Sequence, residues 1–257
     1  MKKANSPNAS NVSLVAFYAN KPVELCNLII RLQKHLANHR LLQEKFVPYQ
    51  IAQVHGTIVG CEGAKNSKGI ISRWFKERRE EKYVDFLGLI NYLQQQAYLP
   101  LVIRFGGYNR QTNYNFSSRS QHLYDRSFQL QSVEDRSIPV LIGWSWSHNA
   151  VTLAIDNLRR SFQQFGLLHK YHINDDSIDN DFYLRLGTVE TQLSSEEIKA
   201  IAVDLCQLLE TNPVYIPVKF EDLAFVQYHD LQLTPATTRV IPLTSIDADQ
   251  LERLYSN

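Results

Sequence analysis

Two amphipathic helical patterns, each followed by a strand pattern, constrain the fold of this chain more than any other feature. The first begins after Pro22 and leads to a strand pattern at residues 49–60. Its apolar residues recur at steps of three and four: Leu25, Leu28, Ile29, Leu32 and Leu36. The second covers residues 152–165, ends at Gly166 and leads to a strand pattern at residues 179–190. This approximate duplication predicts an α+β fold with two similar lobes.

The other periodic segments are mostly strands. Strand patterns lie at residues 12–20, 99–108, 123–132, 137–147, 216–235 and 237–246. We expect helices at residues 83–98 and 193–210. The charged segment 64–82 predicts irregular structure with a solvated helix face at 76–82, and 109–122 predicts a long loop. Residues 1–11 predict a disordered tail, and 12–257 a single domain.

Composition excludes several classes of protein. The 257 residues carry 27 Lys and Arg against 26 Asp and Glu, so a basic footprint for duplex DNA is absent and anion recognition has to be local. Three cysteines without a CxxC pair favour neither a disulfide framework nor a zinc site. No apolar run is long enough for a membrane span. We therefore expect a cytoplasmic protein with reduced thiols and no membrane partner.

His55 and Thr57 are the strongest candidates for chemistry. They share one face of the predicted strand, about 7 Å apart, together with Val59. An imidazole there can move a proton, and a hydroxyl two residues on can hold a phosphoryl oxygen. The pattern H-x-T is weak by itself, because a structural histidine on a strand face gives the same sequence.

The segments around these residues resemble the two-histidine phosphoesterase superfamily, which includes bacterial RNA 2′,3′-cyclic phosphodiesterases. VSLVAFYANKPVELCNLIIRLQKHL resembles the opening strand and helix of the family, and QVHGTIVG its first motif strand. FYLRLGTVETQLSSEEIKAI resembles the second motif strand and its helix, and FEDLAFVQYHDLQLTPATTRVIPL the closing strands. The resemblance implies two pseudo-symmetric lobes of antiparallel sheet and helices around a central cleft, and phosphodiester hydrolysis without metal or other cofactor.

The second motif departs from the family pattern. Tyr183 and Arg185 stand where the family has its second histidine and threonine. The family mechanism needs one histidine as base and the other as acid, and a tyrosine with an ordinary pKa of about 10 is a poor proton acceptor. Arg185 is suited to bidentate phosphate binding. This half of the site is therefore expected to bind phosphate, with Tyr183 as a hydroxyl in place of the histidine.

Two histidines upstream of that strand, His169 and His172, are reserve candidates for the missing proton transfer. The alternative is a polar loop with two solvated histidines. His229 is expected on an exposed rim. Asp179, Asn180 and Asp181 suggest turn chemistry rather than a cation site, because no glycine-bearing loop of calcium-site spacing accompanies them.

Basic and aromatic residues interleave around the loop at 109–122. Those expected to contact substrate are Arg104, Arg119, Tyr124 and Arg126. Arginines with stacking aromatics suit an RNA end or a nucleotide, and a solvated loop with surface aromatics is the alternative.

The sequence favours a metal-free phosphoesterase-like hydrolase acting on a 2′,3′-cyclic phosphate or a related nucleotide or RNA phosphodiester. A non-catalytic RNA- or nucleotide-binding protein on the same fold is the main alternative, and the Tyr183 and Arg185 replacements favour it. A protein-interaction scaffold is a third possibility, for which no sequence feature speaks.

Overall fold

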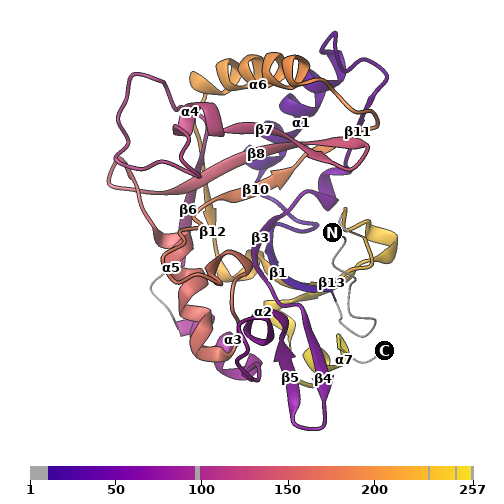
Figure 1. Ribbon diagram of the computed structural model, residues 1–257, viewed down its shortest axis with the longest axis vertical. Coiled ribbons are helices and arrows are strands. Elements are labelled where there is room, and N and C mark those ends of the chain that lie inside the picture. The colour runs from indigo at the N-terminus through magenta and orange to yellow at the C-terminus, as the bar shows by residue number, and fades with distance from the viewer. Residues whose placement is uncertain (1–10, 96–98, 231, 247, 256–257) are drawn as a thin grey trace.

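The computed structural model describes residues 11–95, 99–230, 232–246 and 248–255. The expected tail at residues 1–11 lies, except for Asn11, outside the described residues. Helices and antiparallel sheets make up the fold, so the α+β class is confirmed. Figure 1 shows two main sheets one above the other, with α1 and α6 above the upper sheet and α2 and α3 below the lower one.

The lower sheet has four antiparallel strands in the order β14-β13-β1-β3. Both ends of the chain contribute: β1 is Val12–Ala16, β3 is Gly56–Gly60, β13 is Leu223–Gln227 and β14 is Arg239–Pro242. Every residue of β1 is buried, as expected for a strand with neighbours on both sides. The order leaves β3 at one edge of this sheet.

The upper sheet has eight strands arranged around β8, Arg136–Ser147. Its main order is β12-β6-β8-β11-β2, and β7, β9 and β10 also pair with β8. The bounds are β2 Phe46–Pro48, β6 Leu101–Phe105, β7 Phe128–Val133, β9 Ala150–Val151, β10 Phe182–Arg185, β11 Gly187–Val189 and β12 Val214–Val218. The strand β10 therefore reaches the centre of the molecule from the upper sheet.

The helices confirm the main periodic segments of the sequence. They are α1 Val23–Asn38, α2 Arg73–Glu77, α3 Phe86–Gln95, α4 Leu123–Arg126, α5 Ala154–Ser161, α6 Ser195–Glu210 and α7 Ala248–Arg253. The five predicted apolar positions of α1 are all buried. Ser194 and Glu197 form a capping box that opens α6, and Gly166, in a left-handed conformation, ends the 3-10 turn η2 (Phe162–Phe165) that follows α5.

Several predicted boundaries are wrong. Residues 49–55 do not extend β3, because Ile51–Gln53 form a 3-10 turn, η1, whose Ala52 carbonyl accepts a hydrogen bond from the Ala19 amide. The segment 64–82 is not irregular: it contains the hairpin of β4 (Gly63–Asn66) and β5 (Gly69–Ser72), then α2. The helix α2 ends at Glu77, so most of the expected helix face at 76–82 is not helical.

The long strands expected late in the chain are divided. Residues 179–190 form β10 and β11, divided at Leu186: its amide still donates to the Pro139 carbonyl of β8, but its own carbonyl accepts bonds from the Tyr49 amide and the Gln33 side chain. The predicted strand at residues 216–235 is also divided. The strand β12 ends at Val218, and β13 begins after the 3-10 turn η4, Phe220–Asp222. The segment 123–132 begins as α4 before it becomes β7.

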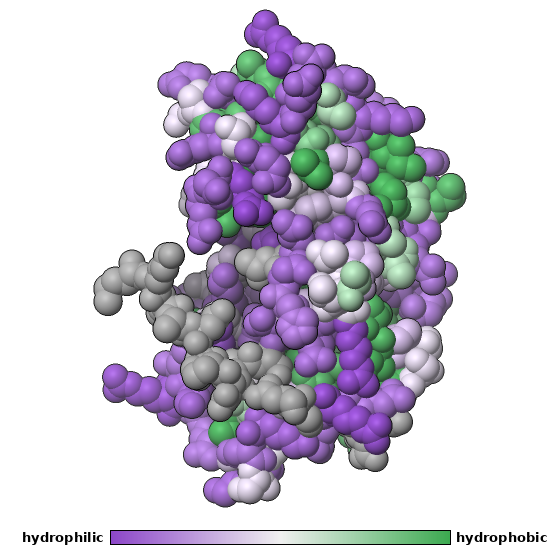
Figure 2. Space-filling view, turned by 90° about the vertical axis from the view of Figure 1, so that its right-hand side faces the viewer, coloured by the Kyte–Doolittle hydropathy of each residue, from purple (hydrophilic) through white to green (hydrophobic). Residues whose placement is uncertain are grey.

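The surface offers no broad apolar face on the side that Figure 2 shows, where hydrophilic residues predominate and apolar ones gather in a band toward the right. Among the described residues, no helix has the length and apolar character needed to cross a membrane.

Candidate functional site

A cavity of about 460 Å³ lies between the two main sheets, where β3 meets β10. Its walls contain predicted site residues from both sheets and from the loops beside them: His55, Thr57, Arg119, His169, Tyr183 and Arg185. The two halves of the predicted site therefore converge on one space.

A β-bulge in β3 decides which side chains of this strand face the cavity. The ladder to β1 is in register at Thr57 and again at Val59, which leaves Ile58 as an extra residue. His55 and Thr57 line the cavity as expected, but the alternation then shifts, so that Gly60 lines it in place of Val59. Val59, expected beside Thr57, is fully buried instead.

Gly56 allows the two motif strands to approach each other closely. A Cβ atom added at Gly56 would lie 2.1 to 2.7 Å from three atoms of the Phe182 ring, which real Cβ contacts do not reach. Phe182 directly precedes Tyr183, so the packing of its ring on Gly56 sets the distance between the two half-sites.

Replacing Gly56 with alanine is expected to destabilise the protein by about 1–3 kcal/mol, because the buried Phe182 ring has to move. The matched control is Gly60→Ala in the same strand, where the added Cβ meets only the carboxylate end of Glu62, a flexible side chain. Urea unfolding of both variants measures the difference. Equal midpoints would show that Gly56 is not needed for the close approach.

His55 is held as a neutral imidazole with a defined tautomer. Its Nδ1 lies 2.7 Å from the carbonyl oxygen of Gln53, so Nδ1 carries the proton and Nε2 keeps a lone pair. Burial, together with the charges of Arg185 and Lys21, lowers the pKa of His55 to about 4 despite that hydrogen bond. The Gln53 side chain donates to the Gln232 carbonyl at 2.7 Å, which fixes the turn that orients the ring. His55 is therefore neutral near pH 7, and its Nε2 lone pair is available as an acceptor.

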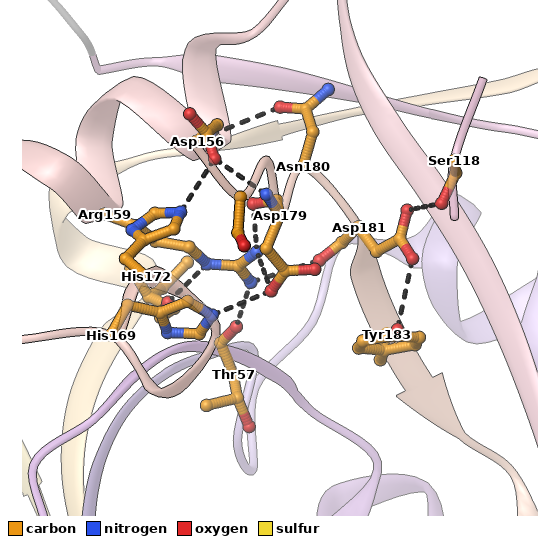
Figure 3. A network of polar contacts seen from close by, with 12 residues as sticks. Thr57, Ser118, Asp156, Arg159, His169, His172, Asp179, Asn180, Asp181 and Tyr183 are labelled. Atoms are coloured by element: carbon orange, nitrogen blue, oxygen red, sulfur yellow. Dashed lines mark hydrogen bonds and ion pairs between the residues drawn. The ribbon is translucent and has the colours of Figure 1, made fainter. Parts of the chain in front are cut away.

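Tyr183 has the opposite character. Burial and the nearby Asp181 carboxylate raise the pKa of Tyr183 above its usual value, so its hydroxyl stays protonated. The hydroxyl donates to Asp181 Oδ2 at 3.1 Å and accepts from Arg126 Nη2 at 3.0 Å. Figure 3 shows the ring below Asp181 with the hydroxyl turned toward it.

Arg159, from α5, connects the two motif strands. Its guanidinium donates five hydrogen bonds of 2.8 to 3.1 Å, which use all of its N–H groups. The acceptors are the carbonyls of Thr57 and Ile58 on one side, and the Asp179 and Asp181 carbonyls and the Asp179 carboxylate on the other. The side chain is 2% exposed, so Arg159 is a buried clamp rather than a ligand of substrate.

The carboxylates of Asp179 and Asp181, which precede β10, accept hydrogen bonds from several surrounding side chains (Figure 3). Asp179 accepts from His169 Nε2 at 2.7 Å, and this bond and the Arg159 charge lower its pKa although burial alone raises it. Burial and the charge of Arg159 lower the pKa of His169 to about 4, so the ring donates Nε2–H as a neutral imidazole. Asp181 accepts from Ser118 at 2.5 Å and from Trp144 at 2.7 Å. These residues have buried partners and do not form the turn expected from the sequence.

The pKa of His169 predicts acid lability. The folded pKa of about 4 lies below the ordinary 6.5, so the unfolded chain binds the proton first and stability falls as pH drops from 6.5 to 4. The full shift corresponds to about 3 kcal/mol. His169→Gln keeps a donor for Asp179 and should reduce the slope of urea-unfolding stability over this window, the remainder coming from His55, whose pKa is also about 4. The exposed His148→Gln serves as control, and an unchanged slope in His169→Gln would contradict this account.

Arg104 and Tyr124, predicted to contact substrate, are both buried in the structure. Neither lines the cavity. The Arg104 guanidinium donates to the carbonyls of Gly106 and Gly107 and lies 4.1 Å from the Trp146 ring. These contacts use its charge and N–H groups within the protein. Tyr124 is 4% exposed. Interleaved arginines and aromatics here pack against each other instead of facing a ligand.

Arg126 and His172 are also displaced from their predicted roles. Arg126 is buried behind Tyr183, where it binds that hydroxyl and Asp181 at 3.1 Å. His172 is fully buried, and its Nε2 donates to Asp156 at 2.8 Å. Neither lines the cavity, but Arg126 binds Tyr183 and the His172 ring packs edge-on against His169, and both of these partners do. His229 is exposed, as expected, and lies outside the cavity lining.

Sequence reasoning missed Arg159 and the structural role of Asp179 and Asp181. Arg159 lies in a correctly predicted amphipathic helix, where an arginine normally indicates the solvated face. The acidic run before β10 was the available signal, since two buried carboxylates require cationic partners. Within the described part of the chain, no three His, Cys, Asp or Glu side chains are arranged to hold a metal ion.

Comparisons with known proteins add little to this geometry. No protein-family model matches the chain, and no curated protein does. Among solved structures, TT0787 of Thermus thermophilus aligns at 13% identity and TM-score 0.41, over 90% of this chain and 93% of that one. A conserved protein of unknown function from Agrobacterium tumefaciens, ATU0111, aligns at 10% identity and TM-score 0.40, over 87% of this chain and 82% of its own.

Proposed function

We propose that the cavity binds a phosphate ester and that the protein hydrolyses a 2′,3′-cyclic phosphate or a related nucleotide or RNA phosphodiester, as a divergent two-histidine phosphoesterase. One observation carries the proposal: His55 and Thr57 from the lower sheet and Tyr183 and Arg185 from the upper sheet line the same cavity. The segment order that resembles that superfamily supports it.

The protonation states of His55 and Tyr183 fit a mechanism with a single general base. His55 Nε2 takes a proton from water, whose oxygen bonds to phosphorus while the bond from phosphorus to one ribose oxygen breaks. Arg185 and the Thr57 hydroxyl hold the phosphoryl oxygens. The released ribose oxygen takes the proton of Tyr183, which regains one from His55 through water. The raised pKa of Tyr183 suits it to donate to an alkoxide and not to act as a base.

A non-catalytic phosphate-binding role is the second candidate. The hydroxyl proton of Tyr183 already has an acceptor in Asp181, so donation to a leaving group requires that bond to break. A site with one base and an engaged tyrosine binds a nucleotide or RNA end without turning it over.

The two candidates separate in one experiment. The purified protein is incubated with adenosine 2′,3′-cyclic phosphate and products are separated by chromatography, while calorimetry measures adenosine 3′-phosphate binding. Turnover that His55→Asn removes supports hydrolysis, whereas binding without turnover supports the alternative. Arg185→Ala should weaken binding in either case. No binding of either nucleotide would reject both candidates.

The cysteines bear on location. Cys26, Cys61 and Cys206 are all free thiols, which suits the reducing environment of the cytoplasm, where we place the protein.

A further inference from the structure

Two further basic residues, Arg119 and Lys170, line the same cavity as Arg185. Arg119 contacts the carboxylates of Asp179 and Asp181, which precede Tyr183 along the chain, whereas Arg185 follows it by two residues. One strand repeat is about 7 Å, so Asp181 and Arg185 lie about two repeats apart on either side of Tyr183, whose ring centre is 5.7 Å from the Arg119 guanidinium.

Arg119 is not required to neutralise these carboxylates. Its contacts are the longest in the network, 3.5 Å to Asp179 and 3.6 Å to Asp181. Asp179 already has Arg159 at 3.1 Å and His169 at 2.7 Å. Asp181 has partners at 2.5 to 3.1 Å: Ser118, Trp144, Arg126 and Tyr183. The Arg119 side chain is 39% exposed and keeps donors for a ligand.

The backbone of Arg119 has a strained conformation. Ser118 and Gln121 exchange two backbone hydrogen bonds, and between them Arg119 and Ser120 both have positive φ, 50° and 61°. A turn of this kind normally selects glycine or asparagine. Its anchor is the Ser118 hydroxyl on Asp181. Strain that the surrounding structure enforces on a cavity residue points to a role for that residue.

Arg119 and Lys170 both contact the ring of Tyr171. The Arg119 guanidinium lies 4.6 Å from its ring centre and the Lys170 ammonium 5.1 Å. Arg119 therefore contacts both the Tyr171 ring and the two carboxylates, and Lys170 contacts the same ring. A rigid guanidinium next to an ammonium is a binding arrangement for phosphate oxygens.

We propose that Arg119 and Lys170 form a second phosphate subsite, so that the preferred ligand carries one phosphate at His55, Thr57 and Arg185 and another at Arg119. This inference rests on the proposed function and narrows its substrate class to nucleotides with two phosphates. The second phosphate is either a 5′-phosphate or the internucleotide phosphate of an RNA end. The cavity of about 460 Å³ exceeds what one phosphate fills.

Calorimetry with three probes that carry no cyclic ester tests the subsite: adenosine 3′-phosphate, adenosine 3′,5′-bisphosphate and a diadenosine ending in a 3′-phosphate. Because hydrogen bonds to charged groups exceed the energy of a tenfold step, the wild type should bind one of the two-phosphate probes at least about tenfold more tightly than adenosine 3′-phosphate. A gain with the bisphosphate identifies a 5′-phosphate, and a gain confined to the dinucleotide identifies an RNA linkage.

The variants assign the gain to the subsite. Arg119→Ala should abolish it while leaving the adenosine 3′-phosphate Kd within about twofold. Lys170→Ala should reduce it. Arg110→Ala, in the same loop as Arg119 but paired with Asp125 of α4, should retain it in full. A gain that survives both Arg119→Ala and Lys170→Ala overturns the inference, as does no gain in the wild type. Failure of adenosine 3′-phosphate itself to bind would instead reject the proposed function.

Discussion

Replacing His55 with asparagine is expected to lower kcat/KM for adenosine 2′,3′-cyclic phosphate by roughly 100- to 10,000-fold, the range that positioned proton transfer contributes. Nε2 is the nitrogen of this ring that keeps a lone pair, because Nδ1–H is bound to Gln53. Asparagine is similar in size but has no group that accepts a proton near neutral pH. Binding of adenosine 3′-phosphate should change little, since Arg185 and Thr57 remain.

The pH profile gives an independent test of the same residue. A base with a pKa of about 4 is active when neutral, so kcat/KM of the wild type should stay level at neutral pH and fall below a midpoint near 4. The control is His229→Asn, an exposed histidine outside the cavity lining, which should match the wild type. A limb near 6.5, or a His55→Asn variant with wild-type rate, would remove His55 from the mechanism.

The sequence predicted which residues of each half-site share a face, because strand alternation is a local property, whereas the convergence of the two halves was an expectation from the family resemblance. Two residues separated by one other share a face wherever they lie in a strand, so His55 with Thr57, and Tyr183 with Arg185, face one space in the structure. The helix α1 was predictable for a similar reason, since its apolar stripe has to be buried.

The structural features that the sequence did not predict depend on contacts between residues far apart in the chain. The bulge at Ile58 is bound by Arg159, which lies 101 residues away in the sequence and donates to its carbonyl. Likewise η1 lies in the segment 49–60, which the sequence predicts as a strand, and its Ala52 carbonyl is bound by the Ala19 amide and the Lys21 side chain. Arg104 resembled a substrate ligand because sequence does not show that its aromatic neighbours enclose it.

Arg159→Met is expected to be the most destabilising substitution, with a loss of about 3–5 kcal/mol, the cost of removing one partner of a buried ion pair. Methionine fills much of the volume but donates no hydrogen bond. The Asp179 carboxylate, 4% exposed, would lose its shortest arginine contact, and four backbone carbonyls would lose a donor. Urea unfolding followed by circular dichroism measures the loss.

The next residue of the same helix supplies the control. Arg160 also makes three hydrogen bonds, to Asp156 and to the carbonyls of Asp175 and Ser177, but its side chain is 30% exposed. Water can replace part of what it provides, so Arg160→Met should lose only about 1–2 kcal/mol. Equal losses of unfolding free energy would mean that Arg159 stabilises the protein no more than a partly exposed helix arginine does. A larger loss at Arg159 would mean that one buried guanidinium holds the His55 and Tyr183 strands together, and that the site depends on a residue whose N–H groups are all bound within the protein.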